Sequence, residues 1–398
     1  MIRIFTIFLA GFCAMCGTAM AQQAPQTVRA AVLRVDPPGL PPISRLDARP
    51  GDLGFAGARL AIQDNDTTGR FMGQDFEAIE VAATPESAGP ELQKLLGQGI
   101  PFIVVLADET QTLALADQAG DAALILNAQA RGDNLRGTDC RANTLHVAPS
   151  HAMMADALAQ FLMWKRWPDW FLIQGSHPQD IALADAYRRA AVKFGAKIVE
   201  ERTYEDTGGG RRTDTGHVQV QAQMPVFTQR AAEHDVLIAA DEAGVFALWL
   251  PYQTWDARPV AGSAGLVPRS WHPALEAWGA TQFQNRFEEL AVRPMREEDY
   301  QTWLALRMIG EAATRTQSAD PVKLREFLLS PAFEIAGFKG QKLTLRDWDH
   351  QLRQPILLTT GSVTVSVSPQ DQYLHQSSAL DTLGIDRPET ECKFRGQR

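Results

Sequence analysis

Short apolar runs alternate with amphipathic segments along most of this chain. The runs predict strands at residues 28–35, 76–82, 101–106, 122–126, 170–174, 196–201 and 236–240, and another that starts at 259–261. Helical spacing predicts helices at residues 91–96, 110–119, 153–165 and 181–194, and an earlier one that starts near Asp52 and ends at the polar stretch 64–69. Unbroken apolar strands between helices are typical of parallel sheets that are covered on both faces. The pattern is interrupted around residues 140–149 and then resumes, so two doubly wound α/β units are expected.

The C-terminal part has a different pattern. Helical spacing recurs at residues 282–290, 299–316 and 321–329. Two strands, at 355–360 and 363–367, are separated by Gly361 and Ser362, and a two-residue connection of this kind predicts a hairpin. The last thirty residues show no regular pattern.

The N-terminus has the pattern of a secretory signal. Arg3 precedes an uncharged apolar run, and Ala19-Met20-Ala21 then places small residues where signal peptidase requires them. A membrane anchor is the alternative, but the run is short for a span and no stop-transfer pattern follows. Lipid attachment at Cys16 is disfavoured because Met15 is too large for the usual site. We therefore expect residues 1–21 to be a cleaved signal peptide and the mature protein to be periplasmic.

Signal removal leaves two of the four cysteines, Cys140 and Cys392. In an oxidising compartment two remaining thiols usually pair, so a disulfide between them is expected.

Charge and motifs exclude several functions. The net charge is −9 with acids and bases interspersed, so no basic patch indicates nucleic-acid binding. Ser176, His177 and Asp180 lack the Gly-x-Ser-x-Gly setting of a catalytic serine. His146 and His151 are five residues apart without a third ligand at fixed spacing, which favours packing over metal binding. No catalytic residue, metal or cofactor is therefore expected, and the chain is not expected to be an enzyme.

Two phrases carry a family resemblance. GARLAI at residues 57–62, and FGAKIV at 194–199 followed by Tyr204, resemble the leucine/isoleucine/valine-binding (type I) periplasmic solute-binding proteins of ABC transporters. A narrower resemblance lies in residues 278–280, 284–287, 337–340, 352–358 and 381–384. These segments look like a subfamily that is associated with pyrroloquinoline-quinone-dependent alcohol dehydrogenase systems.

The resemblance implies a two-lobed fold in which each lobe is a doubly wound, mainly parallel sheet. Lobe one would comprise residues 27–146 and 266–335, lobe two residues 147–265 and 340–368, and residues 369–398 an irregular tail. Such a protein, expected to be a monomer, binds a small molecule between its lobes, closes by hinge motion and presents the closed form to a transporter permease. The alternative is a periplasmic accessory or sensor protein of the alcohol oxidation system that has no role in transport.

Ligands of open α/β folds bind at the carboxyl ends of the strands. The loops expected there offer these candidate residues: Asp108, Glu109, Thr110, Asn127, Gln129, Ser176, His177, Asp241, Glu242, Ser263 and, just beyond, Trp271. Amino-acid binders of this type hold the ligand carboxylate with small hydroxyl residues after the strand equivalent to 101–106, whereas this chain has two acids there, which repel a carboxylate. Because these loops contain no cation except a histidine, the sequence favours a neutral or cationic ligand.

The signal-peptide prediction can be checked on protein purified from the periplasm. Because the small residues end at Ala21, the mature chain should begin at or near Gln22. Mass spectrometry of the N-terminal peptide measures this. An intact Met1 or a lipidated Cys16 would contradict it.

Overall fold

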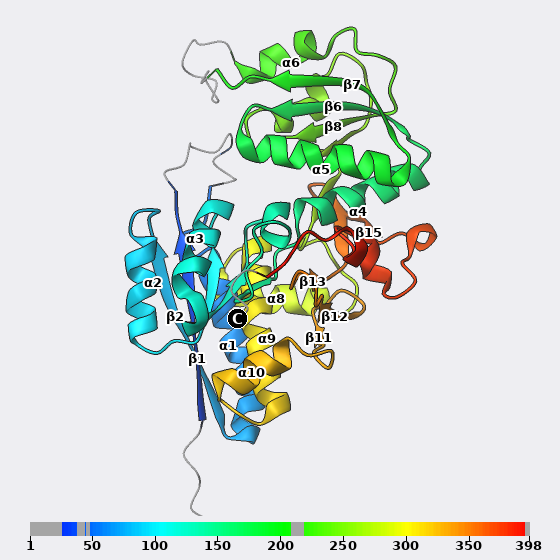
Figure 1. Cartoon of the computed structure of the whole chain (residues 1–398). Coiled ribbons are helices and arrows are strands. Elements are labelled where there is room, and N and C mark those ends of the chain that lie inside the picture. The colour runs from blue at the N-terminus through cyan, green and yellow to red at the C-terminus, as the bar shows by residue number, and fades with distance from the viewer. Residues whose placement is uncertain (1–25, 38–43, 45–47, 208–218, 395–398) are drawn as a thin grey trace, which may run out of the picture.

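A computed structural model describes residues 26–37, 44, 48–207 and 219–394. Two α/β bodies lie one above the other and are joined by several segments of chain (Figure 1). We call the body built on the five-stranded sheet lobe one and the body built on the four-stranded sheet lobe two. The predicted signal peptide lies outside the described residues.

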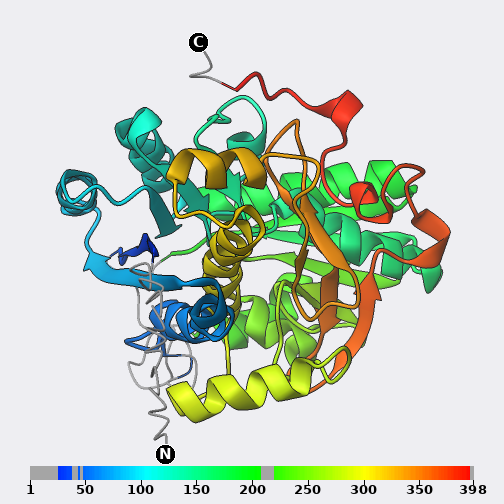
Figure 2. The ribbon, with the colours of Figure 1, turned by 90° about the horizontal axis from the view of Figure 1, so that it is seen from below.

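Lobe one is a parallel sheet in the order β2-β1-β3-β4-β5. Its strands are β1 (Gln26–Val35), β2 (Gln74–Ala83), β3 (Phe102–Leu106), β4 (Leu124–Asn127) and β5 (Thr144–His146). One face is covered by α2 (Ala88–Gly97) and α3 (Glu109–Ala119), the other by α1 (Phe55–Met72), α8 (Ala280–Ala291), α9 (Glu297–Thr316) and α10 (Pro321–Leu328). Helices α1 and α9 pack side by side (Figure 2). Alternate strand residues, such as Val104 and Val105, therefore enter two different cores.

Lobe two repeats this plan with four parallel strands in the order β7-β6-β8-β9. The strands are β6 (Asp169–Gly175), β7 (Lys197–Tyr204), β8 (Val236–Ala240) and β9 (Val260–Gly262). Helices α4 (His151–Trp164) and α5 (Pro178–Phe194) cover one face, and α6 (Val220–Thr228) and α7 (Leu250–Gln253) cover the other. Two covered parallel sheets confirm the predicted fold class.

Two small antiparallel sheets join the lobes. One consists of β10 (Val267–Arg269), β14 (Ile356–Thr359) and β15 (Thr364–Ser368), and the other of β11 (Ile335–Ala336), β12 (Lys342–Leu345) and β13 (Leu352–Arg353). The pairing of β14 with β15 confirms the predicted hairpin. Ile356 and Leu358 enter the core of lobe two, whereas Leu357 between them enters that of lobe one. Strand β14 therefore lies at the junction; the residue boundaries of the two lobes stay a prediction.

The prediction that the first helix ends at residues 64–69 is wrong, because α1 continues to Met72. The polar residues of that stretch have partners far along the chain. Asp64 accepts a hydrogen bond from the Trp303 indole at 2.9 Å, and buried Asn65 donates to the Leu306 carbonyl at 3.0 Å. Both partners belong to α9, which the local pattern could not reveal.

The predicted disulfide is confirmed, with Cys140 bonded to Cys392. The part of the tail that the structure describes, residues 369–394, contains only short 3-10 turns, at Asp371–Tyr373, Ala379–Thr382 and Arg387–Glu389.

A buried arginine holds the junction between the lobes together. Arg136, at the end of a short 3-10 turn, donates to the carbonyls of Ala130 and Gly132 at 3.0 Å each and of Ala148 at 2.7 Å. Its Nε donates to the Gln351 side chain at 2.8 Å. Burial lowers the pKa of Arg136 to about 10, so it is still a cation at neutral pH. The Arg136 side chain thus connects three segments through hydrogen bonds: the loop after β4, the segment after β5 and the segment before β13.

Replacing Arg136 with alanine should destabilise the protein by about 3 kcal/mol or more, because several buried carbonyls lose their donor at once. Chemical denaturation of the purified variant measures the loss. The same substitution at Arg70, an exposed residue near the end of α1, is the control and should change little. Equal stabilities of the two variants would contradict the role of Arg136 at the junction.

Candidate ligand-binding cleft

A cavity of about 180 Å³ lies between the lobes. The elements of lobe one and the adjoining strand β10 contribute Arg131, Val267, Pro268, Arg269 and Glu297, and those of lobe two contribute His151, Met154, Leu183, Tyr187, Asp241, Glu242, Gly262 and Ser263. Sites for drug-sized ligands usually measure about 300–1,000 Å³, so this cavity suits a smaller molecule.

Glu297, the first residue of α9, is the centre of the lobe-one wall. Its Oε1 accepts hydrogen bonds from the Ser270 backbone N–H at 2.6 Å and from the Ser270 hydroxyl at 3.0 Å. Its Oε2 accepts one bond each from Arg131 and Arg269, both at 3.1 Å. Both carboxylate oxygens are therefore occupied. Among the described residues, each guanidinium makes only this one ion pair and keeps further N–H groups free.

The charges of this wall stabilise one another. Burial alone would raise the pKa of Glu297, but Arg131, Arg269 and the Ser270 bonds outweigh it and lower the pKa to about 2. Burial alone would lower the pKa of Arg131, but the carboxylates of Glu297 and Glu242 reverse the effect and raise it. Glu297 and Arg131 are consequently charged at neutral pH.

The opposite wall contains a second ion pair. His151 Nε2 lies 2.5 Å from Oε2 of Glu242, which follows β8. Burial lowers the pKa of His151, but Glu242 outweighs that effect and raises it; burial raises the pKa of Glu242, but His151 reverses the shift and lowers it. His151 is only 1% exposed, and its Nδ1 is buried without a hydrogen-bond partner among the described residues. A protonated His151 thus has an N–H group left for a ligand.

Three of the residues expected from sequence line the cavity: Asp241, Glu242 and Ser263. Asp241 is largely structural, because its carboxylate accepts the backbone N–H groups of the three residues 245–247 at 2.6–2.8 Å. The Ser263 hydroxyl accepts the Asp241 backbone N–H at 2.9 Å. Glu242 is therefore the acid of this set that keeps a carboxylate oxygen available in the cavity.

On the side of lobe one, the expected residues do not line the cavity. Asp108 caps α3 by accepting the Gln111 N–H at 2.8 Å, and Thr110 is exposed on the same helix. Asn127 closes its own loop, donating to the Ala130 carbonyl at 2.8 Å and accepting the Gln129 N–H at 3.1 Å. The side chains of Asp108 and Asn127 thus have local structural roles.

Glu109 stands close to the cleft without lining it. Burial raises its pKa, while the charges of His151 and Glu242 act on it from the cleft. Trp271 lies in the core of lobe one, 1% exposed and stacked on Tyr300 with ring centroids 4.8 Å apart. It borders a neighbouring cavity of about 560 Å³, beyond the Arg269–Glu297 pair.

The last two expected residues belong to lobe two and lie outside the cavity lining. The Ser176 hydroxyl accepts the backbone N–H of Asp206 at 3.0 Å, and His177 Nε2 is hydrogen-bonded to the carboxylate of the same aspartate at 2.9 Å. Contact of any expected residue with a ligand stays a prediction.

Sequence reasoning missed the two arginines of the cleft. Arg131 follows the expected loop 127–130 by one residue, and Arg269 lies four residues beyond the expected loop 262–265. The loops named from the sequence contain no cation except a histidine, but the lining of the cavity adds these two arginines from just outside them. His151 and Glu297 were also missed as cleft residues. Among the described residues, no group of three or more His, Cys, Asp or Glu side chains is arranged to hold a metal ion.

Two lobes with a charged cleft between them define a receptor for a small solute, and the sequence comparison agrees. The model of the periplasmic binding protein family matches residues 46–362, so the chain belongs to that family. This is a family of binding proteins, in agreement with the expectation that the chain is not an enzyme. No helix in the described part of the chain is long and apolar enough to cross a membrane. No curated protein sequence matches the chain.

Solved structures of similar fold cover nearly the whole chain. A leucine-, isoleucine-, valine-, threonine- and alanine-binding protein from Brucella ovis, in its closed conformation, has 15% identity and a TM-score of 0.72 over 94% of this chain and 100% of its own. A solute-binding protein of an ABC transporter from R. palustris, in complex with benzoate, has 14% identity and a TM-score of 0.66 over 92% and 100%. An ABC transporter substrate-binding protein from Desulfitobacterium hafniense, in complex with Leu, has 15% identity and a TM-score of 0.67 over 86% and 100%. At such identities the likeness shows the fold.

The ion pairs of Glu297 should make stability depend on pH. Its folded-state pKa of about 2 lies below the ordinary value of 4.5, so its contribution is fully present above pH 4.5 and disappears as the pH falls towards 2. The stability difference between the wild type and Glu297→Gln should shrink by roughly 3 kcal/mol across this window. Denaturation curves at several pH values measure it.

The control for this experiment is Glu289→Gln, because Glu289 is exposed on α8. It should match the wild type at neutral pH. A stability difference for Glu297→Gln that stays constant down to pH 2 would contradict the assignment.

Proposed function

We propose that the protein, as a monomer, binds a small solute bearing a carboxylate in the cleft between its lobes and delivers it to the permease of an ABC transporter. The observation that carries the proposal is the pair Arg131 and Arg269 around a carboxylate, Glu297, whose oxygens are already occupied.

Free hydrogen-bond donors outnumber free acceptors in the cleft, which favours a ligand rich in acceptors. The carboxylates of Asp241 and Glu297 are used within the protein, which leaves few acceptors for a ligand ammonium group. Free donors remain on Arg131, Arg269 and Nδ1 of His151. A carboxylate accepts hydrogen bonds only and pairs well with guanidinium groups. The expectation of a neutral or cationic ligand counted only the loops at the strand ends, which do not include Arg131 and Arg269.

The size and walls of the cavity support a small organic acid. Met154, Leu183 and Val267 give the cavity an apolar side that suits a short hydrocarbon group. The ligands named for the structural relatives, Leu and benzoate, both carry a carboxylate. The relatives that bind them are substrate- or solute-binding proteins of ABC transporters, which supports the same role for this chain.

The resemblance to the subfamily of pyrroloquinoline-quinone-dependent alcohol oxidation supports a narrower source for the ligand. Oxidation of a primary alcohol through the aldehyde ends in a carboxylic acid. We propose that this protein binds such an acid. The resemblance to alcohol-oxidation systems and the arginines of the cleft both favour a carboxylate ligand.

Isothermal titration calorimetry with matched probes tests the ligand class. We expect binding of at least one of acetate, glycolate, benzoate and leucine, and much weaker binding of its amide, because only the acid pairs with two guanidinium groups. Arg131→Met should weaken binding of that acid by at least about tenfold, as loss of a charged hydrogen bond costs about 1.5–3 kcal/mol.

A variant of a residue outside the cavity lining serves as the control. Asp108→Ser keeps a capping side chain on α3 and should leave the affinity unchanged. An amide that binds as tightly as its acid, or an Arg131→Met variant with wild-type affinity, would contradict the proposed site.

A further inference from the structure

The C-terminal tail, residues 369–394, makes specific contacts with both lobes. On lobe two, Gln160 of α4 binds the tail at two points: its Oε1 accepts the Gln370 N–H at 2.9 Å, and its Nε2 donates to the Thr382 hydroxyl at 3.1 Å. Leu383 is fully buried in the core that α4 and α5 form. The first half of the tail is therefore an integral part of lobe two.

A buried ion pair strengthens this attachment. Asp156 of α4 is 0% exposed and pairs with Lys193 of α5 at 2.8 Å. The same Lys193 donates to the carbonyls of Thr382 and Gly384 at 3.0 Å each, and Asp156 accepts the Gly384 N–H at 2.8 Å. Arg189 pairs with the other Asp156 oxygen at 2.6 Å, so the tail backbone at residues 382–384 adds to an existing cluster of one buried carboxylate and two part-exposed cations. Detaching the tail would remove three hydrogen bonds from this cluster.

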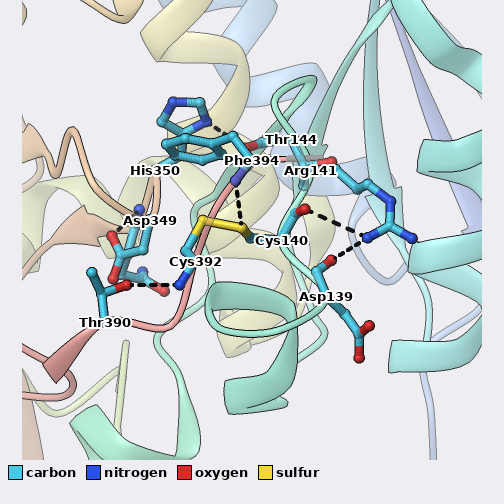
Figure 3. Close-up of a disulfide and its surroundings, with 10 residues drawn as sticks. Asp139, Cys140, Arg141, Thr144, Asp349, His350, Thr390, Cys392 and Phe394 are labelled. Carbon is cyan, nitrogen blue, oxygen red and sulfur yellow. Dashed lines mark hydrogen bonds between the residues drawn. A yellow bond between two sulfur atoms is a disulfide. The ribbon is translucent and has the colours of Figure 1, made fainter. Parts of the chain in front are cut away.

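The far end of the tail is fixed to lobe one. The bond from Cys392 reaches Cys140 in the loop between β4 and β5, where Cys140 is 1% exposed (Figure 3). The ring of Phe394 stacks on His350 with centroids 4.1 Å apart, and the Phe394 N–H points to the Cys140 sulfur at 3.2 Å. His350 in turn is hydrogen-bonded to the Thr144 carbonyl of β5 at 3.1 Å. This anchor is covalent.

Little chain separates the two anchors. From Gly384 to Cys392 the backbone can span at most about 26–29 Å when fully extended. Part of this length is already bound, because the Ile385 carbonyl accepts hydrogen bonds from Arg346 at 3.2 Å and from the Trp348 indole at 3.3 Å. Both donors follow β12, whose residues pack on the core of lobe one. The tail therefore has little slack between the lobes.

We propose that the tail is a strap that limits how far the two lobes can separate. Lobe two holds the tail through Asp156 and Lys193. Lobe one holds it through the disulfide at Cys140 and through Arg346, which donates to Asp381 at 3.1 Å and to the Leu383 carbonyl at 2.6 Å. Wide opening would therefore have to break the attachments on one of the two sides. The strap keeps the unliganded protein closer to the binding-competent arrangement, which reduces the conformational cost of closing. This inference does not depend on which ligand the cleft takes.

Interlobe distances in the ligand-free protein test the strap. Spin labels on noncanonical residues at Lys94 of lobe one and Glu233 of lobe two, both exposed, report the separation by pulsed electron resonance without added cysteines. Two variants each weaken the attachment on one side: Cys140→Ser with Cys392→Ser on lobe one, and Lys193→Gln on lobe two. Both should shift the distance distribution to longer values and widen it. Lys197→Gln makes the same charge change at an exposed position of β7 and should leave the distribution as in the wild type.

A second measurement avoids any dependence on the folding of the variants. Reducing the disulfide of the labelled wild type with a phosphine, followed by reoxidation, should widen the distribution reversibly. The proposal is overturned if the cysteine variant, Lys193→Gln and reduction of the disulfide all leave the distribution unchanged, or if only loss of the disulfide changes it. In the latter case the disulfide would act within lobe one alone.

Discussion

A single buried guanidinium, that of Arg136, links the junction of the lobes to the ligand site. A buried cation needs several acceptors at once, and this one finds them in three segments that are far apart in sequence. Two of its partners, the carbonyls of Ala130 and Gly132, flank Arg131 directly. The Arg131 carbonyl in turn accepts the His151 N–H at 2.9 Å at the start of α4. The requirement to satisfy one buried charge therefore also positions a cation and a histidine of the cleft.

The ligand preference of the cleft depends on which of its charged groups already have hydrogen-bond partners within the protein. Both carboxylate oxygens of Glu297 and of Asp241 accept hydrogen bonds from within the protein, so these two residues position neighbouring groups. Arg131 and Arg269 each give one hydrogen bond to Glu297 and retain others. A count of formal charges alone would make the cleft nearly neutral, whereas the count of free hydrogen-bonding groups shows an excess of donors. The excess of free donors favours a carboxylate ligand over an ammonium ligand. Donors that lose water without gaining an acceptor cost free energy, and only the carboxylate supplies acceptors.

The sequence predicted those features that have local or compositional causes. All five residues of β3 are buried, so its apolar run identified it as an internal strand. The hairpin at Gly361 follows from turn length, and the disulfide follows from the number of cysteines left after the signal. The end of α1 was misplaced because Asp64 and Asn65 bind residues of α9, more than two hundred positions away. The site was predicted only in part for the same reason. Asp108 looked like a ligand group but caps a helix, while Glu297 reaches the cleft from a helix that the strand-end rule does not consider.

Binding of a carboxylate by Arg131 and Arg269 is the feature on which the proposed function depends. A crystal structure of the complex with whichever acid binds tests it most directly. We expect a carboxylate with its oxygens about 2.7–2.9 Å from guanidinium nitrogens of both Arg131 and Arg269, between the walls that Glu297 and Glu242 form. A ligand bound outside this cavity, or one that directs an amine or a hydrocarbon group at these arginines, would contradict it.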